Sequence, residues 1–249
     1  MGVYGPDDVA FLLVAGYNLL GYTQELSDDS EAILEVSTTL GDTAEEYTAV
    51  GVSKMMLKQR VFYDDTDNAT DEALLAALGA EKVVCYGVEG NTLGKHFVGF
   101  KGALGRHYNR VARLAELHKA EVDYVGTGAI EEGIILHSHQ AETADGDTEG
   151  ASSQDAGASS ASGGSGYLQV SALTLGTATS VTFNIRHSAD DITYANLITF
   201  TTVTAAPGHA TSHQRSTVSG TVNRHLAVSW ADVGGTFTSA TFMIGFKRS

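Results

Sequence analysis

The sequence predicts a mainly β protein: an N-terminal β-sandwich or barrel with one short packed helix, followed by an antiparallel β-sandwich. Three observations support this fold class. The 249 residues include only 2 Pro but 28 Gly, which suits many tight turns between strands. Residues 53–63 and 181–186 alternate polar and apolar side chains, the pattern of half-buried strands. Only residues 70–79 have the composition and spacing of a helix.

A segment without large apolar residues divides the chain. Residues 141–166 contain no Val, Ile, Leu, Met or aromatic residue, and Gly and Ser dominate their second half. Such a segment buries too little apolar surface to offset the entropy lost on ordering its backbone. We therefore predict a flexible acidic and Gly/Ser-rich linker between a domain at 1–140 and a domain at 167–249.

Charge is distributed unevenly along the chain. Residues 1–140 carry a net charge of −12, residues 141–166 carry −5, and residues 167–249 carry +2. Binding to nucleic acid requires a basic surface that displaces counterions from phosphate, and an acidic domain lacks one. The sequence therefore argues against specific binding of DNA or RNA, while a surface that DNA passes without adhering remains compatible with it.

Neither cysteine usage nor hydropathy indicates a secreted or membrane protein. The single Cys85 rules out an intrachain disulfide, and its apolar neighbours suggest an unreactive thiol in a strand. The apolar run at 11–14 is too short to span a bilayer, and it follows Asp7 and Asp8 rather than basic residues. We expect a protein that is made and used in a cytoplasm, with no membrane partner.

The N-terminal half is interpreted as strands around one helix. In residues 53–63, Met55, Leu57, Val61 and Tyr63 lie on one face, and Lys54, Lys58 and Arg60 lie on the other with Met56. Residues 31–40 could form a short helix or a strand, and their β-branched residues favour a strand. Residues 41–51 are acidic and turn-rich, and we expect a projecting loop. Further strands are predicted at 9–22, 82–88, 95–104, 114–125 and 129–137.

The predicted helix at 70–79 has recognisable ends. Thr70 can cap the free N–H groups, Asp71 and Glu72 suit the positive end of the helix dipole, and Gly79 suits the C-terminal stop. An apolar stripe with helical spacing would pack on a sheet. The stripe consists of Leu74, Leu75 and Leu78.

The order of these features resembles the major tail, or tail-tube, proteins of long-tailed bacteriophages (siphoviruses). The resemblance rests on the acidic loop and charged strand at 38–65, the short helix, and the strands within 82–104 and 117–136. It covers roughly the first 140 residues. The segment at 38–65 reads TTLGDTAEEYTAVGVSKMMLKQRVFYDD, in which the charged strand ends in Phe-Tyr-Asp.

The resemblance implies a virion structural protein with no enzymatic activity. Members of that family form hexameric rings that stack into the tail tube through which DNA is ejected. The implied partners are other copies of the chain and other tail proteins: tape measure, terminators and baseplate. DNA would pass the lumen without specific binding. The implied location is the tail of the virion, assembled in the host cytoplasm.

Residues for contacts between subunits follow from this interpretation. The cationic face of residues 53–63 is poorly placed for nucleic acid in an acidic domain, so a contact with the acidic loop of a neighbouring copy is the better account. The candidates are Asp42, Glu45, Glu46 and Tyr47 in the loop and Lys54, Lys58 and Arg60 in the strand.

The C-terminal half has the strand spacing of a sandwich. Val181, Phe183 and Ile185 alternate with polar residues, and Trp230 is a candidate core anchor. The other strands are predicted at 167–175, 192–203, 222–230 and 237–246, where Phe242, Ile244 and Phe246 share one face. This half resembles the β-sandwich domains that decorate tail and capsid proteins and, more loosely, carbohydrate-binding modules. The alternative function is therefore binding of a host-surface glycan through Tyr167, Tyr194 or Trp230.

No motif predicts a cofactor or a metal. Residues 145–150 match the start of a calcium loop, but Ala156 stands where the bidentate Glu is required. His137 and His139 would share a strand face, yet a third ligand with suitable spacing is missing. The sequence lacks GxSxG, GxxxxGK[ST] and HExxH, so it predicts no enzyme of those classes.

Overall fold

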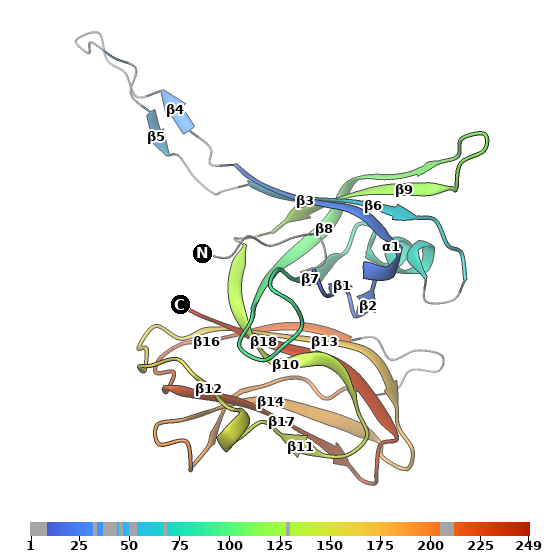
Figure 1. Ribbon diagram of the computed structural model, residues 1–249. Coiled ribbons are helices and arrows are strands. Elements are labelled where there is room, and N and C mark those ends of the chain that lie inside the picture. The colour runs from blue at the N-terminus through green and yellow to red at the C-terminus, as the bar shows by residue number, and fades with distance from the viewer. Residues whose placement is uncertain are drawn as a thin grey trace.

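The computed structural model describes residues 9–31, 34–36, 44, 47–49, 54–66, 69–127, 130–204 and 212–249. Within these residues the fold is mainly β, with one α-helix, as the sequence predicts. An 11-stranded antiparallel sheet runs through both halves of the chain, and a 5-stranded sheet faces its C-terminal part. Figure 1 shows the curled N-terminal part of the large sheet above and the sandwich below.

The N-terminal half is a curled sheet in the order β3-β6-β9-β8-β7-β1-β2. Its strands are β1 (Leu12–Val14), β2 (Tyr17–Asn18), β3 (Thr23–Glu31), β6 (Lys54–Phe62), β7 (Glu81–Gly87), β8 (His96–Val111) and β9 (Lys119–Gly126), with a 3-10 turn at Leu20–Tyr22. The alternation predicted for β6 is confirmed, because Leu57 and Val61 are buried while Lys58 is exposed. Burying this apolar face against the rest of the curled sheet is what fixes the register of β6.

Strand β8 joins the two halves because its two ends have different partners. Residues 96–99 pair with β10 (Glu131–Glu142), whereas residues 102–111 pair with β9. Beyond Ile134, β10 leaves β8 and pairs along its remaining length with β18 of the C-terminal half. The boundary predicted at residue 140 therefore lies inside a strand. The division into two domains stays a prediction, and one sheet crosses it.

The C-terminal half is a sandwich of two sheets. The first continues the large sheet as β10-β18-β13-β16, and the second has the order β11-β17-β14-β15, with β12 also on β17. Their strands are β11 (Gly146–Asp147), β12 (Gln154–Asp155), β13 (Gly164–Thr174), β14 (Ser180–Ser188), β15 (Ala195–Thr199), β16 (Ser212–Val218), β17 (His225–Val233) and β18 (Ser239–Arg248). Phe242, Ile244, Phe246 and Trp230 are buried in the core between them, which confirms their predicted role.

The structure differs from the flexible linker predicted at 141–166. This segment ends β10, forms β11, a 3-10 turn (Gly150–Ser152) and β12, and starts β13. Its backbone is bound to the sandwich: the Trp230 indole donates to the Ala144 carbonyl at 2.8 Å, and Thr148 exchanges two hydrogen bonds with Val228. Backbone pairing rather than apolar side chains holds the segment, so its composition does not reveal its order.

Carboxylates of this acidic segment are also bound to the sandwich. Glu149 forms an ion pair with Arg186, and Asp155 forms one with Arg224. Asp145 accepts a hydrogen bond from the backbone N–H of Asp232 at 2.9 Å. The C-terminal half, which is nearly neutral with a small cationic excess, therefore binds the acidic segment to itself.

The helix α1 (Thr70–Ala77) forms where it is predicted, with two corrections. Thr70 is the first helical residue and not the cap, and its hydroxyl donates to the Phe62 carbonyl at 2.9 Å. Of the predicted apolar stripe only Leu74 is buried, whereas Leu75 and Leu78 are exposed. Gly79 follows the helix with φ +69°, which confirms it as the stop.

A third, two-stranded sheet lies apart from the body of the molecule. It pairs β4 (Leu34–Val36) with β5 (Tyr47–Ala49), and Figure 1 shows it projecting beyond β3 and β6. The strand interpretation of residues 31–40 is therefore confirmed at 34–36. Other boundaries differ from prediction: residues 112–118 form the turn before β9 rather than its start, and β16 was not predicted.

Candidate functional site

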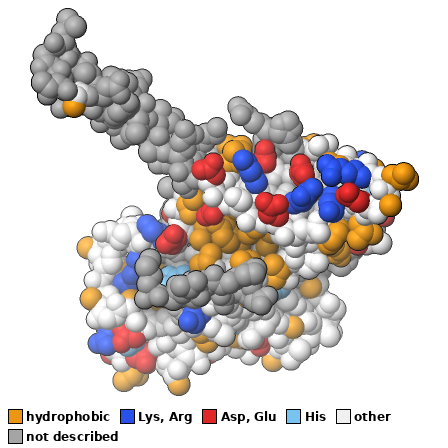
Figure 2. Space-filling model, turned by 45° about the horizontal axis from the view of Figure 1, so that its top comes forward, with side chains coloured by type: hydrophobic (Ala, Val, Ile, Leu, Met, Phe, Trp, Pro, Cys, Tyr) orange, Lys and Arg blue, Asp and Glu red, His pale blue; other side chains and the backbone are white. Residues whose placement is uncertain are grey.

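The candidate site is the outer face of strands β3, β6 and β9, where charged residues of both signs alternate. Two rows cross the three strands in register, Glu25–Arg60–Glu121 and Ser27–Lys58–Asp123. Figure 2 shows red and blue side chains intermingled over this upper part of the molecule. The two rows line an open depression with a volume of 380 Å³.

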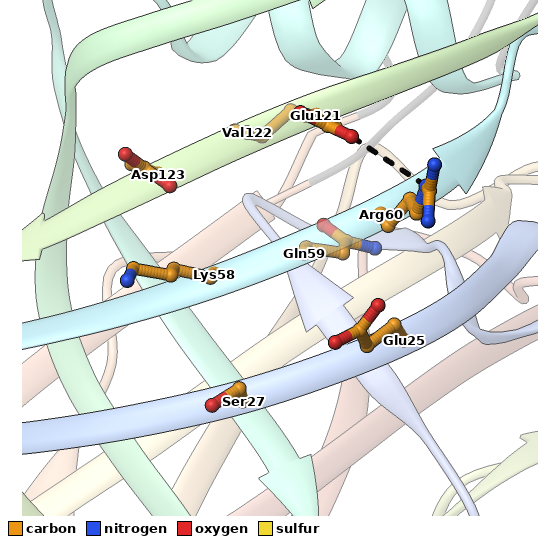
Figure 3. A pocket seen from close by; sticks show the side chains of 8 residues that line it. All are labelled: Glu25, Ser27, Lys58, Gln59, Arg60, Glu121, Val122 and Asp123. Carbon is orange, nitrogen blue, oxygen red and sulfur yellow. Dashed lines mark ion pairs between the residues drawn. The ribbon is translucent and has the colours of Figure 1, made fainter.

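Each cation of this face lies beside carboxylates of its own chain. Arg60 Nε is 3.5 Å from Glu121 Oε1, with Glu25 on the other flanking strand. In Figure 3 the Lys58 side chain lies between Ser27 and Asp123. Three carboxylates and two cations give the depression a net charge of −1. The face is thus a mosaic and not the purely cationic surface that β6 alone predicts.

A buried polar network fixes β6 beneath this face. The Tyr124 hydroxyl donates to Gln59 Oε1 at 2.7 Å, and Gln59 Nε2 donates to Thr23 Oγ1 at 2.7 Å. Thr23 Oγ1 in turn donates to the Leu19 carbonyl at 2.7 Å. Because every member has a partner, the network holds the three strands in one register. The charged rows above it are therefore presented on a rigid support.

The predicted contact residues divide into two groups. Lys58 and Arg60 lie together on the face just described. Lys54 starts β6 and Tyr47 starts β5, but the described part of the structure does not extend to their side chains. Asp42, Glu45 and Glu46 lie outside the described residues. Sequence reasoning missed the three carboxylates that flank Lys58 and Arg60, since they come from strands far away in the chain.

One edge of strand β3 is left unpaired by the other described strands. It is nine residues long, and among the described strands it pairs with β6 alone. Its side chains are mostly polar, with Glu25, Asp28, Asp29 and Glu31 in its sequence. An exposed strand edge presents unpaired N–H and C=O groups that can pair with another chain. Sequence reasoning did not predict this strand, because its long polar run hides the alternation.

The other candidates from the sequence are built into the sandwich. His137 is buried and stacks on Phe242, with ring centroids 4.1 Å apart, and its Nε2 is 3.3 Å from Glu142 Oε1. Burial lowers its pKa, although Glu142 acts in the opposite direction. His139 Nε2 is 2.9 Å from the Ser171 hydroxyl. No group of three or more His, Cys, Asp or Glu side chains suited to a metal occurs in the described ranges.

The three aromatic candidates for glycan binding are all buried. Tyr167, Tyr194 and Trp230 are each less than a tenth exposed. Tyr167 packs against Phe97, and Trp230 packs against Phe242 and His137. A sugar platform requires an exposed ring, so none of these residues supports the alternative function.

Among the described residues, no helix is both long enough and apolar enough to span a membrane.

Comparison with known proteins gave structural similarities only. No family model matches the sequence, and no curated protein matches it. Among solved structures, the chain is similar to one from the virion of a native gene transfer agent particle, with 14% identity and a TM-score of 0.42 over 52% of this chain and 98% of that one. A chain from the tail of the empty particle, refined with C6 symmetry, has 13% identity and a TM-score of 0.38, covering 51% and 97%.

A third similarity covers nearly the whole chain. The Dit protein (gp 19.1) of SPP1, described as a hub of the adsorption apparatus in phages that infect Gram-positive hosts, has 10% identity and a TM-score of 0.35, covering 95% of this chain and 98% of that one. The chain is thus structurally similar to tail and virion proteins at low identity. Its relation to major tail proteins is the resemblance in sequence features described above.

Proposed function

We propose that this chain is a structural protein of a phage-type tail, in which copies join edge to edge into rings and the rings stack into a tube that passes DNA. The observation that carries the proposal is the free edge of β3, nine residues long and paired on one side only among the described strands. Such an edge is a hazard for a monomer, but it becomes an interface when ring closure pairs every edge.

The charge of the chain supports the same function. A net charge of −15 repels phosphate, so a lumen lined by such a protein offers DNA few adhesion points. The mosaic face of β3, β6 and β9 suits a contact that fixes the orientation of two copies more than it adds to their affinity. If the two copies were shifted relative to one another, like charges would meet across the contact. We assign Lys58 and Arg60 to this contact, together with the acidic loop residues Asp42, Glu45 and Glu46 of a neighbouring copy.

The remaining assignments follow from the resemblance. We propose sixfold rings, stacking through the loop predicted at 41–51 and the N-terminal arm, and contacts with the tape measure, terminator and baseplate proteins. The sandwich would lie on the outside of the ring. Because β10 pairs with both β8 and β18, it would be carried rigidly with the ring rather than on a flexible tether.

Negative-stain electron microscopy of the purified full chain tests this function. The full chain is needed because truncation at residue 140 would cut β10 inside its pairing with β18. We expect rings or tubes at micromolar concentrations and above. Single particles of monomer size at every concentration up to the millimolar range would overturn the proposal.

A further inference from the structure

A short segment of the chain lies along one edge of β17. Strand β14 pairs with β17 over its whole length, whereas the other edge of β17 is paired only by the two-residue strands β11 and β12. Between these two strands the chain forms the 3-10 turn at Gly150–Ser152. We call residues 143–156 the strap. It covers a sheet edge that would otherwise present unpaired N–H and C=O groups to other chains.

The strap is bound to the sandwich without taking part in its core. Thr148 is the only buried residue of the strap, and no strap residue belongs to the apolar core between the two sheets. Backbone bonds outside the ladder pairs are few, such as the one from the Thr148 N–H to the Val228 carbonyl at 2.9 Å. Releasing the strap therefore breaks hydrogen bonds but exposes little apolar surface of its own.

Two ion pairs hold the strap on either side of its 3-10 turn. Glu149, before the turn, is paired with Arg186, and Asp155, after the turn, is paired with Arg224. Hydrogen bonds between charged groups are stronger than those between neutral groups, so these two pairs contribute much of the binding. Both arginines belong to the sandwich and both carboxylates belong to the strap. Removing the carboxylates therefore weakens the attachment and leaves the core unchanged.

The strap also covers the single tryptophan of the chain. The Trp230 indole N–H donates to the Ala144 carbonyl at 2.8 Å, and a Cβ on Gly146 would lie 2.6 Å from Trp230 Cζ2, so the strap backbone lies against the ring. Trp230 is 6% exposed, and its ring also packs on His137 and Phe242. Opening the strap would uncover one edge of the indole while these core contacts keep the ring in place.

We infer that residues 143–156 form a releasable strap, which opens as a unit while the sandwich stays folded and uncovers the β17 edge and one side of Trp230. The apolar core and the β10–β18 and β14–β17 ladders do not involve the strap, so they persist when it opens. The lack of large apolar side chains is what allows the segment to leave at low cost. The strap stays joined to β10 and β13, so it can close again and keep the β17 edge from pairing with other chains.

Two variants of the full chain test the strap. The unlatched variant carries Glu149→Gln and Asp155→Asn, which remove both ion pairs but keep the shapes of the side chains. The locked variant carries Asp147→Cys and Ser229→Cys, at two residues that are directly paired between β11 and β17, where the spacing allows a disulfide. Glu116→Gln is the control, because it removes an exposed ion pair in the turn at the tip of the β8–β9 hairpin, far from the strap in the chain.

The decisive measurement is urea unfolding followed by two probes, the quenching of Trp230 fluorescence by acrylamide and the far-UV circular dichroism of the sheets. In the wild type and the control, Trp230 should become accessible at lower urea concentrations than those that unfold the sheets, because the strap opens first. The equilibrium constant for opening should rise at least ~10-fold in the unlatched variant, since two charge-assisted contacts are lost. In the oxidised locked variant the two probes should change together. Coincident transitions in both the wild type and the unlatched variant would overturn the inference.

Hydrogen–deuterium exchange gives a positional measurement in the absence of denaturant. The bonded N–H groups of the strap, such as those of Thr148 and Ala156, should exchange at least ~10-fold faster in the unlatched variant than in the wild type. The amides of the β14–β17 ladder should keep their rates, because that ladder does not depend on the strap. Strap amides that exchange as slowly as the β14–β17 ladder in the unlatched variant would show that the strap is an inseparable part of the sandwich.

Discussion

Arg215 of β16 holds Glu131 of β10 in a two-point ion pair where the two halves of the chain meet. Arg215 Nε is 2.9 Å from Glu131 Oε2, and Nη2 is 2.8 Å from Oε1. The Ser165 hydroxyl donates to the same carboxylate at 2.9 Å, and the Tyr167 hydroxyl donates to it as well. This cluster lies beside the point where β8 and β10 separate, so it fastens the curled sheet to the sandwich.

Replacing Glu131→Gln should lower the free energy of unfolding by about 3 kcal/mol at pH 7, because it leaves Arg215 without its partner in a mostly buried site. The neighbouring substitution Glu132→Gln, at an exposed position, should change it by less than about 0.5 kcal/mol. Urea unfolding of both variants measures the difference. Equal stabilities for the two variants would show that the ion pair does not hold the halves together.

The same pair gives an expected pH dependence. Burial raises the pKa of Glu131, but hydrogen bonds from Arg215, Tyr167 and Ser165 outweigh it and hold the pKa below its usual 4.5. A carboxyl with a lowered pKa in the folded state stabilises the fold above pH 4.5, and this contribution is lost as the pH falls further. The difference in free energy of unfolding between wild type and Glu131→Gln should therefore be constant from pH 7 to about 5 and shrink below pH 4.5. A gap that stays constant down to pH 3 would show that these hydrogen bonds do not lower the pKa of Glu131.

Cys85 should be unreactive in the folded protein. Its side chain is fully buried in β7, and burial raises the pKa of the thiol to about 12, so little thiolate exists at pH 8. Labelling with a thiol reagent should be slow under native conditions and complete within minutes in denaturant. A Leu117→Cys variant, with its new thiol on the hairpin tip, should label one extra site at once. Rapid labelling of the wild type would show that β7 opens readily.

The surroundings of Gly133 leave no room for even a methyl side chain. A Cβ at this position of β10 would lie 2.6 Å from the Phe246 carbonyl oxygen and 2.7 Å from the Phe97 ring. We expect Gly133→Ala to destabilise the protein by about 1–3 kcal/mol through overpacking. Gly21→Ala, which meets nothing within 4 Å, is the matched control and should change stability by less than about 1 kcal/mol. Thermal unfolding compares the two variants. If Gly133→Ala left the stability unchanged, β10 would not pack as closely on Phe97 and Phe246 as the structure shows.

Charge reversal on the mosaic face should separate stability from assembly. The ion pair of Arg60 with Glu121 is partly exposed to solvent, so a chain with Lys58→Glu and Arg60→Glu should lose only about 1 kcal/mol of folding stability. Ring formation should nevertheless fail, because five acidic side chains would then cover the face. Lys247→Glu, a charge reversal in β18, should assemble normally. If the double variant formed rings in unchanged yield, Lys58 and Arg60 would not take part in the contact between copies.

The sequence predicts the parts of this fold that depend on local pattern. The alternation in β6 and β14, the helix start near Thr70 and its stop at Gly79 are local properties, and the structure confirms them. Residues 141–166 show the limit of such reasoning. Their order depends on backbone pairing with β17 and on Arg186 and Arg224, which lie much later in the chain. The opposite net charges of the segment and the C-terminal half were the available signal.

Only part of the candidate site could be predicted from the sequence, for the same reason. The pattern of β6 identified Lys58 and Arg60, but Glu25, Glu121 and Asp123 reach them only through the registers of β3 and β9. Strand registers between distant segments are set by the whole sheet and not by any one strand. The free edge of β3 is likewise a property of the assembled sheet, because it follows from which strands are neighbours.

Hydrogen–deuterium exchange at β3 tests the central claim most directly. The full chain is compared below and above its assembly concentration, and exchange is read over Thr23–Glu31. The amides that do not bond to β6 should exchange within seconds in the dilute protein and at least ~10-fold more slowly in the assembled one. Exchange over β3 that is equally fast in both states, while particles have formed, would show that this edge does not join the copies.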